Sequence, residues 1–365
     1  MTKKIKILIA TGGTGGHVFP AYSLANHFSD NNYNVELITD HRGYKFLKDF
    51  KNLKIKRITS SPLIKKNIFK IIFSIFVISY SILRSLIFLI LNRPKIIFGM
   101  GGYSSFPTCI AAIILKIEFI IYENNLILGK ANKYLLPFAK KIFVSYKDLE
   151  GIAGKYNSKV CEIGNLIRKE IIDSSKKKKE KNNIKEIKIL VLGGSQAAKV
   201  FAKKLPQIFK RCKDSQIPLK IYQQCLKNQN EQLSTFYKNL NIDFEIFNFS
   251  NDIITYFSKV NLAITRSGAS MLGELVNANL PFISVPLPTS ADNHQLKNAL
   301  YYEKKNFSYL IEEKDLENKL FNLIKSINED RSLIEKIKMN QSQYSDKNVF
   351  KNINNQIEKI LDEKN

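Results

Sequence analysis

Apolar residues follow the chain in two series of short continuous runs, separated by longer segments in which apolar positions recur at helical spacing. The first run lies at residues 5–10, and the run that opens the second series lies at residues 187–192. Continuous apolar runs of this length are typical of parallel strands covered by helices on both faces. Later strands are predicted at residues 35–39, 95–98, 119–122, 142–144 and 160–163, and then at 219–223, 244–247, 262–265 and 281–285. The pattern predicts an α/β protein with two doubly wound, Rossmann-like halves that face one cleft.

Glycine-rich loops follow the strands that open these halves. Residues 11–17 read Thr-Gly-Gly-Thr-Gly-Gly-His, and a helix is predicted over residues 20–28, with Pro20 near its first turn. A second glycine loop lies at residues 99–107 and a third at residues 193–198. Ligands of doubly wound sheets bind where such loops leave the carboxyl ends of the strands. The loops therefore predict ligand sites in both halves.

The first loop has part of the pattern of a dinucleotide-binding site. Gly13 and Gly15 match two glycines of G-x-G-x-x-G, but Val18 occupies the position of the third. Asp40 ends the second predicted strand, where a carboxylate that binds ribose is expected in nicotinamide enzymes. A nicotinamide-dependent dehydrogenase is therefore an alternative, although it leaves the second half of the chain unexplained.

The densest group of polar candidates lies at residues 259–295. Arg266, Ser267 and Ser270 stand between a predicted strand and a helix, so a cation, two hydroxyls and helix N–H groups are available to a phosphate. Glu274 follows Ser270 by about one helical turn on the same side, where a carboxylate suits a sugar diol. The stretch favours a nucleotide-sugar site; the alternative is an ordinary capped helix.

Two further groups are candidates for the chemistry of the first half. His17 lies at a loop–helix junction, where an imidazole can face the ligand and act as a base near neutral pH. Its alternative role is to hydrogen-bond the loop. Glu123 and Asn125 follow a predicted strand, and their side chains can bind hydroxyl groups at its carboxyl edge.

Residues 68–91 are the most apolar part of the chain and are about long enough to span a bilayer. Arg84 interrupts the stretch, and the loops before and after it must share one compartment to form one site. Basic residues flank or punctuate it, which fits helices lying on an anionic membrane. They are Lys65, Lys66, Lys70, Arg84, Arg93 and Lys95. We expect residues 65–95 to be partly core and partly a membrane face; a core helix pair is the alternative.

Composition narrows the classes of partner. The 365 residues exceed what one hydrophobic core usually serves, and the net charge of +25 favours anionic partners. No zinc-finger spacing or RNP-like segment accompanies the charge, so nucleic acid is not expected. The apolar run near the start is too short for a signal peptide. Four cysteines without a C-x-x-C pair are expected to be reduced and mostly buried: Cys109, Cys161, Cys212 and Cys225.

The lysine-rich residues 174–186 are expected to form a solvated linker. We place one domain at residues 1–166 and a second at residues 167–344. The tail, residues 317–365, has a helical pattern. Its last part, about residues 345–365, is expected to pack back on the first domain.

Four motifs in this order resemble one family. Residues 11–20 and 99–103 match its two amino-terminal glycine loops, and residues 193–197 match the loop that opens its nucleotide domain. Residues 266–269 with Glu274 match its donor-binding loop and helix. Over nearly its whole length the chain resembles the cytoplasmic N-acetylglucosaminyltransferases of peptidoglycan synthesis, the MurG family.

The resemblance implies a GT-B glycosyltransferase bound peripherally to the cytoplasmic face of the inner membrane. Such an enzyme transfers N-acetylglucosamine from its UDP donor to undecaprenyl-pyrophosphoryl-muramyl-pentapeptide, with inversion and without a metal or cofactor. The first domain then binds acceptor and membrane, and the second binds UDP-N-acetylglucosamine. His17 is the expected general base, with Glu123 as its rival. The implied substrate-binding residues are Thr14, Gly15, Gly16, Asn125, Arg168, Ser195, Ser250, Arg266, Ser267, Ala269, Ser270, Met271, Leu272, Gly273, Glu274, His294 and Gln295.

The chain departs from the family's pattern at four positions. Tyr122 replaces the histidine of a His-Glu-x-Asn segment, and Leu166 replaces the proline of a Gly-Asn-Pro-x-Arg linker, which we expect to loosen the hinge. Phe106 replaces a small residue, and His294 replaces one of two paired glutamines. A GT-B enzyme with another acceptor, such as diacylglycerol or a natural product, and a non-catalytic membrane-surface protein are the remaining alternatives.

Overall fold

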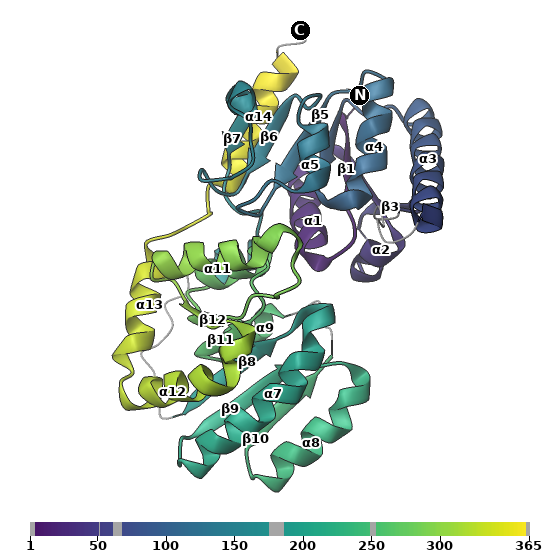
Figure 1. The fold of residues 1–365 in the computed structure, drawn as a ribbon. Helices are drawn as coiled ribbons and strands as arrows, with labels where there is room; N and C mark the ends of the chain where they lie inside the picture. The colour runs from purple at the N-terminus through teal and green to yellow at the C-terminus, as the bar shows by residue number, and fades with distance from the viewer. Residues whose placement is uncertain (1–3, 51, 61–67, 175–185, 249–252, 363–365) are drawn as a thin grey trace. The chain divides into compact units, whose positions relative to one another are not determined.

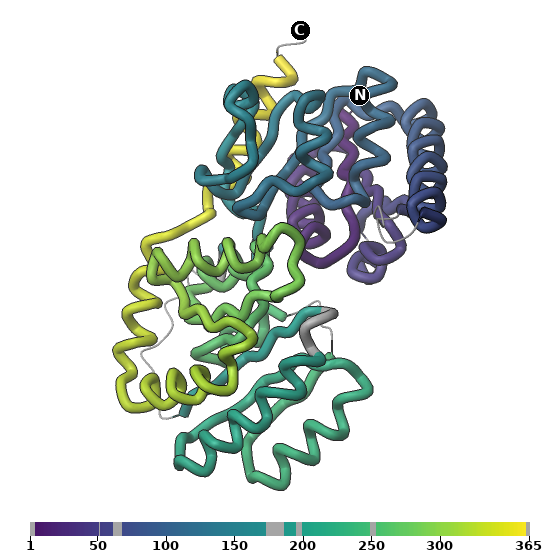
Figure 2. Tube along the Cα trace, viewed as in Figure 1, coloured from purple at the N-terminus to yellow at the C-terminus, as the bar shows by residue number. Residues whose placement is uncertain are grey.

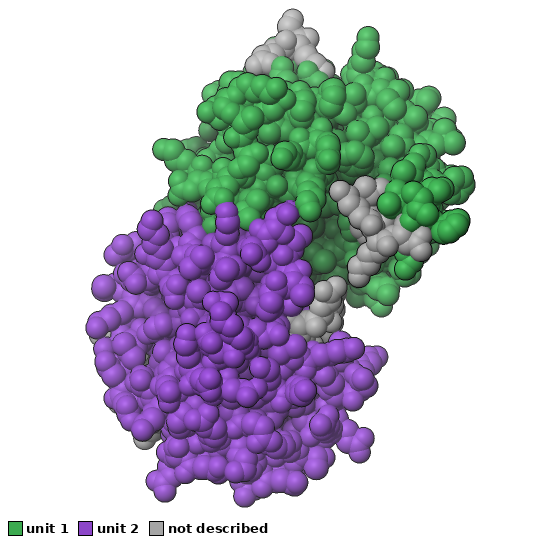
Figure 3. All heavy atoms as spheres, viewed as in Figure 1, with its two compact units in different colours: residues 1–168, 346–365 green, residues 169–345 purple. Residues whose placement is uncertain are grey.

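The computed structural model describes residues 4–50, 52–60, 68–174, 186–248 and 253–362, leaving out the side chains of residues 173–174 and 195–198. The chain divides into two compact units (Figure 1; Figure 3). Unit 1 contains residues 1–168 and 346–365, and unit 2 contains residues 169–345. Lys65, Lys66, Ser250 and most of the expected linker lie outside the described residues.

Unit 1 is built on a parallel sheet of seven strands in the order β3-β2-β1-β4-β5-β6-β7. Ile7 of the central strand lies opposite Val35 of one neighbour and Ile96 of the other. The chain passes from β1 outward to β3 and then crosses back to β4, so the strand order reverses between β1 and β4. The strands are β1 Lys6–Ala10, β2 Asn34–Thr39, β3 Lys54–Arg57, β4 Ile96–Gly99, β5 Phe119–Glu123, β6 Lys141–Val144 and β7 Val160–Glu162.

The two faces of this sheet carry separate cores. Ile7 and Ile9 pack with helices α1 and α14, whereas Leu8 and Ala10 pack with α4 and α5. Successive side chains of a strand point to opposite faces, which explains why β1 is apolar throughout. The helices of unit 1 are α1 Gly15–Asp30, α2 His41–Leu47, α3 Ile68–Leu91, α4 Gly102–Ile114, α5 Lys130–Leu135 and α14 Val349–Asp362.

Helix α1 begins earlier than predicted, at Gly15 rather than at Pro20. Proline lacks an N–H group, so Pro20 cannot pair with the carbonyl of Gly16 four residues before it. The Asn124 side-chain amide donates to that carbonyl instead, at 2.9 Å. The helix therefore extends into the glycine loop because a residue from another strand supplies the missing donor.

Unit 2 has a parallel sheet of six strands in the order β10-β9-β8-β11-β12-β13, which reverses between β8 and β11. The strands are β8 Ile187–Leu192, β9 Leu219–Gln224, β10 Asp243–Phe247, β11 Leu262–Thr265, β12 Phe282–Ser284 and β13 Tyr309–Leu310. The helices are α6 Lys169–Ser174, α7 Gly194–Asp214, α8 Asn230–Asn239, α9 Ile254–Phe257, α10 Ala269–Asn277, α11 His294–Lys304, α12 Leu316–Glu329 and α13 Ser332–Ser342. The predicted class, two doubly wound α/β halves, is confirmed.

After unit 2 the chain returns to unit 1 and forms helix α14 there. This helix is the last coloured segment of the trace in Figure 2. Val349, Ile353 and Ile357 are buried in the core that also contains α1. His27 of α1 binds the Asn354 side chain at 2.8 Å and stacks on Phe350. The end of the chain is thus part of the amino-terminal unit.

Candidate functional site

The four glycine-rich or polar loops occupy equivalent places in the two sheets. In unit 1 the loops after β1 and β4 leave adjacent strands at the point where the strand order reverses. In unit 2 the loops after β8 and β11 do the same, and the N–H of Arg266 donates to the carbonyl of Leu192 at 3.3 Å. Ligands of doubly wound sheets bind at such switch points. Each unit therefore brings its two motifs together at one edge.

Asp40 holds the two loops of unit 1 together. One carboxylate oxygen accepts from the N–H groups of Gly13, at 2.9 Å, and Gly43, at 2.7 Å. The other accepts from Ser104 at 3.0 Å, and the side chain is only 4% exposed. Burial raises the pKa of Asp40, but these hydrogen bonds and the Arg42 charge outweigh it and hold the pKa below its ordinary value. The carboxylate expected to bind a ribose in the dinucleotide alternative is therefore occupied within the fold.

This structural role of Asp40 is not among the sequence predictions. The residue caps helix α2, whose third residue is Gly43. An aspartate directly after an apolar strand and before a helix is a recognisable N-cap signal, so the cap could have been found. Its contact with Gly13 could not, because the two residues meet only in the folded sheet.

His17 lies in the first turn of α1, against the second glycine loop. A Cβ atom placed on Gly101 would lie 3.2 Å from its ring, and one placed on Gly102 would also lie 3.2 Å from it. Both glycines adopt left-handed backbone, with φ of +82° and +70°. Thr14 is the N-cap of α1, and Gly15 and Gly16 are in its first turn, so these three residues directly precede His17 in the sequence. The predicted catalytic histidine and both loops thus meet at one switch point.

Glu123 is occupied by hydrogen bonds in the fold. Its Oε1 atom accepts from the Asn125 side chain at 2.9 Å, and its Oε2 atom accepts from the Gly129 N–H and the Asn132 side chain, both at 2.9 Å. The side chain is 3% exposed. A carboxylate with this many donors positions the loop after β5, and a role as the rival base receives no geometric support. Asn125 lies beside it and also donates to Asn124 at 3.0 Å.

The segment that leads out of unit 1 is tied at two points. Leu166 donates its N–H to the Tyr122 hydroxyl at 3.1 Å, and that hydroxyl also pairs with Ser145 at 2.8 Å. Asp346 accepts from the Asn165 N–H at 2.9 Å. A proline at 166 has no N–H and a histidine at 122 has no hydroxyl, so two departures from the family pattern meet in one hydrogen bond. The tie runs against the expectation that loss of the proline loosens this segment.

Arg168 is the last residue of the first segment of unit 1 and is 6% exposed. Its guanidinium lies over the Phe19 ring of α1, 5.2 Å from the ring centroid. This contact places the residue next to the first helix of the unit. Its expected contact with the donor stays a prediction.

Arg266 is buried at the start of the donor loop of unit 2. Its guanidinium donates to the carbonyls of Val285, at 3.2 Å, and Pro286, at 3.0 Å, and forms an ion pair with Glu313. Only its Nε atom lacks a hydrogen-bond partner among the described residues. The geometry makes Arg266 a brace between β11 and the loop after β12, rather than a cation directed outward.

The first turn of α10 is the more open part of this loop. Gly268 caps the helix with φ of −71°, and a Cβ atom placed on it would meet no atom of the described residues within 4 Å. The buried Ser267 hydroxyl has no hydrogen-bond partner in the described part of the chain. The N–H groups of a helix start carry partial positive charge and attract phosphates. The helix then continues through the remaining predicted positions, Ala269, Ser270, Met271, Leu272, Gly273 and the buried Glu274.

The predicted sugar loop precedes α11. Gln295 accepts from the Leu287 N–H at 3.0 Å, so its side chain closes this loop, and His294 pairs with the Ala291 carbonyl at 2.7 Å. Asp292 and Asn293 both have left-handed backbone, with φ of +52° and +55°. The remaining candidates are described only in part: Ser195 lies in the first turn of α7 without a described side chain, and Ser250 is outside the described residues.

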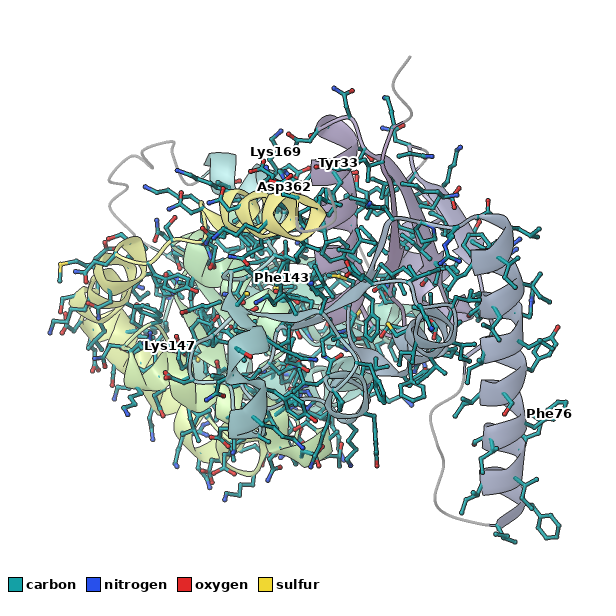
Figure 4. The ribbon with its side chains drawn as sticks, turned by 90° about the horizontal axis from the view of Figure 1, so that it is seen from above. Tyr33, Phe76, Phe143, Lys147, Lys169 and Asp362 are labelled. Carbon is teal, nitrogen blue, oxygen red and sulfur yellow. The ribbon has the colours of Figure 1, made fainter. Side chains whose placement is uncertain are left out.

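Helix α3 has its polar and apolar faces reversed relative to an ordinary surface helix. The small residues Ser74, Ser81 and Ser85 are buried, and Ser85 lies 3.5 Å from Thr108 of α4. The opposite face exposes large apolar side chains: Ile68, Phe69, Ile72, Phe73, Ile75, Phe76, Tyr80, Leu83, Ile87, Ile90 and Leu91. In Figure 4 the helix stands at the edge of unit 1 with Phe76 pointing away from it. Residues 68–91 form one helix, so the alternative of a core helix pair is wrong. Phe76 is 68% exposed.

Two other properties of the chain bear on the site. Among the described residues, α3 is the one helix long and apolar enough to cross a membrane, by length and composition. The same part of the chain contains no group of three or more His, Cys, Asp or Glu side chains placed to hold a metal ion. The four cysteines are unpaired, and all but Cys161 are buried.

Comparisons with known proteins agree on one family. The glycosyltransferase family 28 N-terminal domain matches residues 7–144, and the glycosyltransferase family 28 C-terminal domain matches residues 188–357. A protein of Pelagibacter ubique (strain HTCC1062) is 37% identical, over 98% of this chain and 99% of its own. It is named UDP-N-acetylglucosamine--N-acetylmuramyl-(pentapeptide) pyrophosphoryl-undecaprenol N-acetylglucosamine transferase. A Rickettsia felis protein of the same name is 34% identical, over 87% of this chain and 91% of its own.

Solved structures share the fold. MurG of Acinetobacter baumannii superposes with a TM-score of 0.74 at 23% identity, covering 97% of this chain and 99% of that one. A complex of Staphylococcus aureus MnaA with UDP gives a TM-score of 0.69 at 15% identity, covering 98% and 97%. With the identity to the Pelagibacter protein over almost the whole length of both chains, these matches show that the chain is a glycosyltransferase and belongs to the MurG family, within glycosyltransferase family 28.

Proposed function

We propose that this chain transfers N-acetylglucosamine from UDP-N-acetylglucosamine to the muramyl 4-hydroxyl of an undecaprenyl-pyrophosphoryl-muramyl-pentapeptide. The observation that carries the proposal is the pair of switch points, each with two motifs of the family at one sheet edge. The Pelagibacter and Rickettsia relatives, which match this chain over 99% and 91% of their own length, are named for this reaction. The product is the completed lipid-linked precursor of peptidoglycan.

Unit 2 binds the UDP part of the donor in this proposal. The α10 start, with open space over Gly268 and the N–H groups of its first turn, faces the diphosphate. Arg266 acts indirectly, because its NH1 and NH2 groups already brace the loop. Ser195, Ser250, Glu274 and Gln295 keep the donor contacts that the family resemblance implies.

Unit 1 supplies the base. The muramyl hydroxyl oxygen attacks C1 of N-acetylglucosamine, the bond from C1 to the phosphate oxygen breaks, and the electron pair leaves with UDP. His17 takes the hydroxyl proton, since its imidazole lies between both glycine loops while the Glu123 oxygens are occupied. Attack opposite the leaving group inverts the configuration. General-base assistance of this kind contributes about 10²–10⁴-fold in rate.

The test is transfer of labelled N-acetylglucosamine to a lipid-linked muramyl-pentapeptide analogue with EDTA present. Robust transfer supports donor, acceptor and metal independence together. Stabilisation of the protein by UDP without transfer points to a different acceptor, and the absence of both signals contradicts the proposal.

Helix α3 is proposed to lie on the anionic cytoplasmic surface of the inner membrane, as a peripheral contact. A span is disfavoured because β3 before the helix and β4 after it belong to the same sheet, so both ends of α3 must stay on one side. Its apolar face and the exposed Lys70, Arg84 and Arg93 suit an interfacial helix. This arrangement keeps the enzyme beside a substrate whose polyprenyl chain stays in the bilayer.

Vesicle flotation tests this surface. The double substitution of Ile72 and Phe76 by serine removes two exposed apolar groups and should weaken binding to phosphatidylglycerol vesicles by about tenfold or more. Leu300→Ser is the matched control, since Leu300 is also an exposed apolar helix residue, 45% exposed, but lies in unit 2. Equal flotation of the double variant and the control would contradict the assignment.

A further inference from the structure

The first turn of α1 carries His17 but has little support of its own. It begins with Gly15 and Gly16, and glycine favours a helix less than any residue except proline. The side chain of the N-cap residue, Thr14, makes no capping hydrogen bond among the described residues. Pro20 lacks the N–H group that would bind the Gly16 carbonyl from within the helix. Contacts from outside the helix therefore hold this turn in place.

Two side chains from other elements bind consecutive carbonyls of the turn. The amide of Asn124, directly after β5, donates to the Gly16 carbonyl at 2.9 Å. The hydroxyl of Thr11, directly after β1, donates to the His17 carbonyl at 2.9 Å. Thr11 is fully buried and Asn124 is 5% exposed, so both hydrogen bonds are shielded from water. The backbone on both sides of the His17 α-carbon is thus fixed from the sheet.

The Asn124 side chain is itself oriented by its neighbours. Its oxygen accepts from the Asn125 amide at 3.0 Å, which leaves its nitrogen directed at Gly16. The Asn125 amide also donates to the buried Glu123 carboxylate at 2.9 Å. A chain of hydrogen bonds therefore runs from Glu123 through both asparagines to the peptide group that precedes His17.

The ring of His17 has little freedom of its own, since it lies against Gly101 and Gly102. A shift of the backbone at this turn would therefore move the imidazole nitrogens. A general base must lie within hydrogen-bonding reach of the proton that it takes, and a displacement of about 1 Å can cost about 10²-fold in rate. The Gly16 carbonyl is thus a point at which a residue without substrate contact can affect the base.

We propose that Asn124 is a positioning residue for the transfer reaction. Its amide sets the place of His17 by binding the Gly16 carbonyl, which Pro20 leaves without a donor from the helix. The inference rests on the proposed function, in which His17 is the base. Asn124 occupies the unspecified position of the His-Glu-x-Asn segment, so the family pattern gives it no role.

The test is a double-mutant cycle of Asn124→Ala and Pro20→Ala, measured by steady-state transfer at saturating substrates. Asn124→Ala alone should lower kcat by about tenfold or more and leave the KM for UDP-N-acetylglucosamine unchanged, because unit 2 binds the donor. Pro20→Ala restores a main-chain N–H group four residues after Gly16. In that background Asn124→Ala should lower kcat by less than about threefold, since the carbonyl keeps a donor.

Asn352→Ala is the matched control. The Asn352 amide of α14 donates to the carbonyl of Ile163, directly after the edge strand β7, at 3.2 Å, so this change removes a similar hydrogen bond from the same unit. It should leave kcat within about twofold of wild type. Thermal unfolding verifies that each variant is folded. If Asn124→Ala does not fold, Asn124→Asp replaces it, because it keeps the side-chain volume and the oxygen that accepts from Asn125.

A loss of kcat that Pro20→Ala recovers supports the proposal. The proposal is overturned if Asn124→Ala keeps wild-type kcat, loses the same factor in both backgrounds, raises the donor KM instead, or loses no more than Asn352→Ala. Failure of the proposed function appears separately. It would show as a wild-type chain without transferase activity or as a His17→Ala variant with wild-type kcat, and either result would overturn this inference as well.

Discussion

The two switch points differ in how far the fold itself occupies them. In unit 1, Asp40 binds Gly13 and Ser104, and the His17 ring fills the space over Gly101 and Gly102. In unit 2, a Cβ atom placed on Gly268 or Gly194 would meet no atom of the described residues within 4 Å, so the space above the backbone is open. The same strand order thus supports a braced edge in one unit and an open edge in the other.

The difference matches what each unit is proposed to do. A base must be held within hydrogen-bonding reach of one hydroxyl, which favours loops locked by side chains. A nucleotide phosphate needs backbone N–H groups and room to approach them, which favours glycine without a neighbour. Duplicated topology therefore does not imply duplicated chemistry.

The largest expected effect is on turnover, from His17→Ala. Removal of the base should lower kcat by about 10²–10⁴-fold while UDP still stabilises unit 2 against heat. The measurement is steady-state transfer at saturating substrates, with UDP-dependent thermal unfolding as the control. A kcat close to that of the wild type would show that His17 is not the base. The contacts that hold the unit 1 loops would then have only a structural role.

The next largest effect is on the free energy of unfolding, when glycine is replaced by alanine once at each of the two edges. Gly101→Ala forces a side chain into left-handed backbone and against His17, and should cost about 1–3 kcal/mol of unfolding free energy. Gly268→Ala introduces no clash and should change stability by no more than about 0.5 kcal/mol.

The same alanine at Gly268 should nevertheless raise the KM for UDP-N-acetylglucosamine, because its methyl group occupies the space that the phosphate needs. Chemical denaturation and donor titration of both variants provide the comparison. Equal stabilities, or an unchanged donor KM for Gly268→Ala, would contradict the contrast between a braced and an open edge.

A smaller effect is expected at the tie between Tyr122 and Leu166. Tyr122→Phe leaves the buried Leu166 N–H without its acceptor and should cost about 1–2 kcal/mol. In a Leu166→Pro background the N–H is already absent, so the same change should cost less. A double-mutant cycle measured by urea unfolding tests this coupling, and fully additive losses would show that the two positions act independently.

The smallest effect is the dependence of stability on pH that Asp40 contributes. The pKa of Asp40 is lowered in the folded chain, so its ionised form contributes stability above about pH 4 that is lost as pH falls through the lowered value. Asp40→Asn should be less stable than wild type near neutral pH, and this difference should shrink as the solution is acidified through that window. A constant difference between about pH 6 and about pH 2 would mean that the charge of Asp40 contributes nothing to the brace.

The sequence predicted the buried strands well and the edges poorly. Runs such as 187–192 and 262–265 are apolar at nearly every position because both faces are covered, and their predicted bounds match β8 and β11. The edge strand β3, Lys-Ile-Lys-Arg, and the two-residue β13 were not predicted, since three of the four β3 residues face solvent and β13 is too short for any period. The predicted start of α1 was wrong because the donor that satisfies Gly16 comes from Asn124, 108 positions away.

The candidate site shows the same limit. Residue types and spacing correctly placed Arg266 directly after β11, His17 in the first turn of the helix after β1, and Glu274 in the helix after β11. They could not reveal that Arg266 pairs with Glu313, or that Glu123 is surrounded by donors from its own loop. The pair of Arg266 with Glu313 depends on packing between distant segments, and the Glu123 hydrogen bonds depend on the conformation of the chain just after β5. Placement at a strand end depends only on local sequence.

The return of α14 to unit 1 has a consequence for the order of events during synthesis. Val349, Ile353, Ile357 and Ile360 belong to the same core as Ile7 and Ile9, so this core stays incomplete until α14 has left the ribosome. Unit 2 lies wholly between the two parts of unit 1 and can close earlier. The half of the enzyme that is translated second is therefore expected to finish folding first, and the core beneath His17, the proposed base, is completed only when α14 packs.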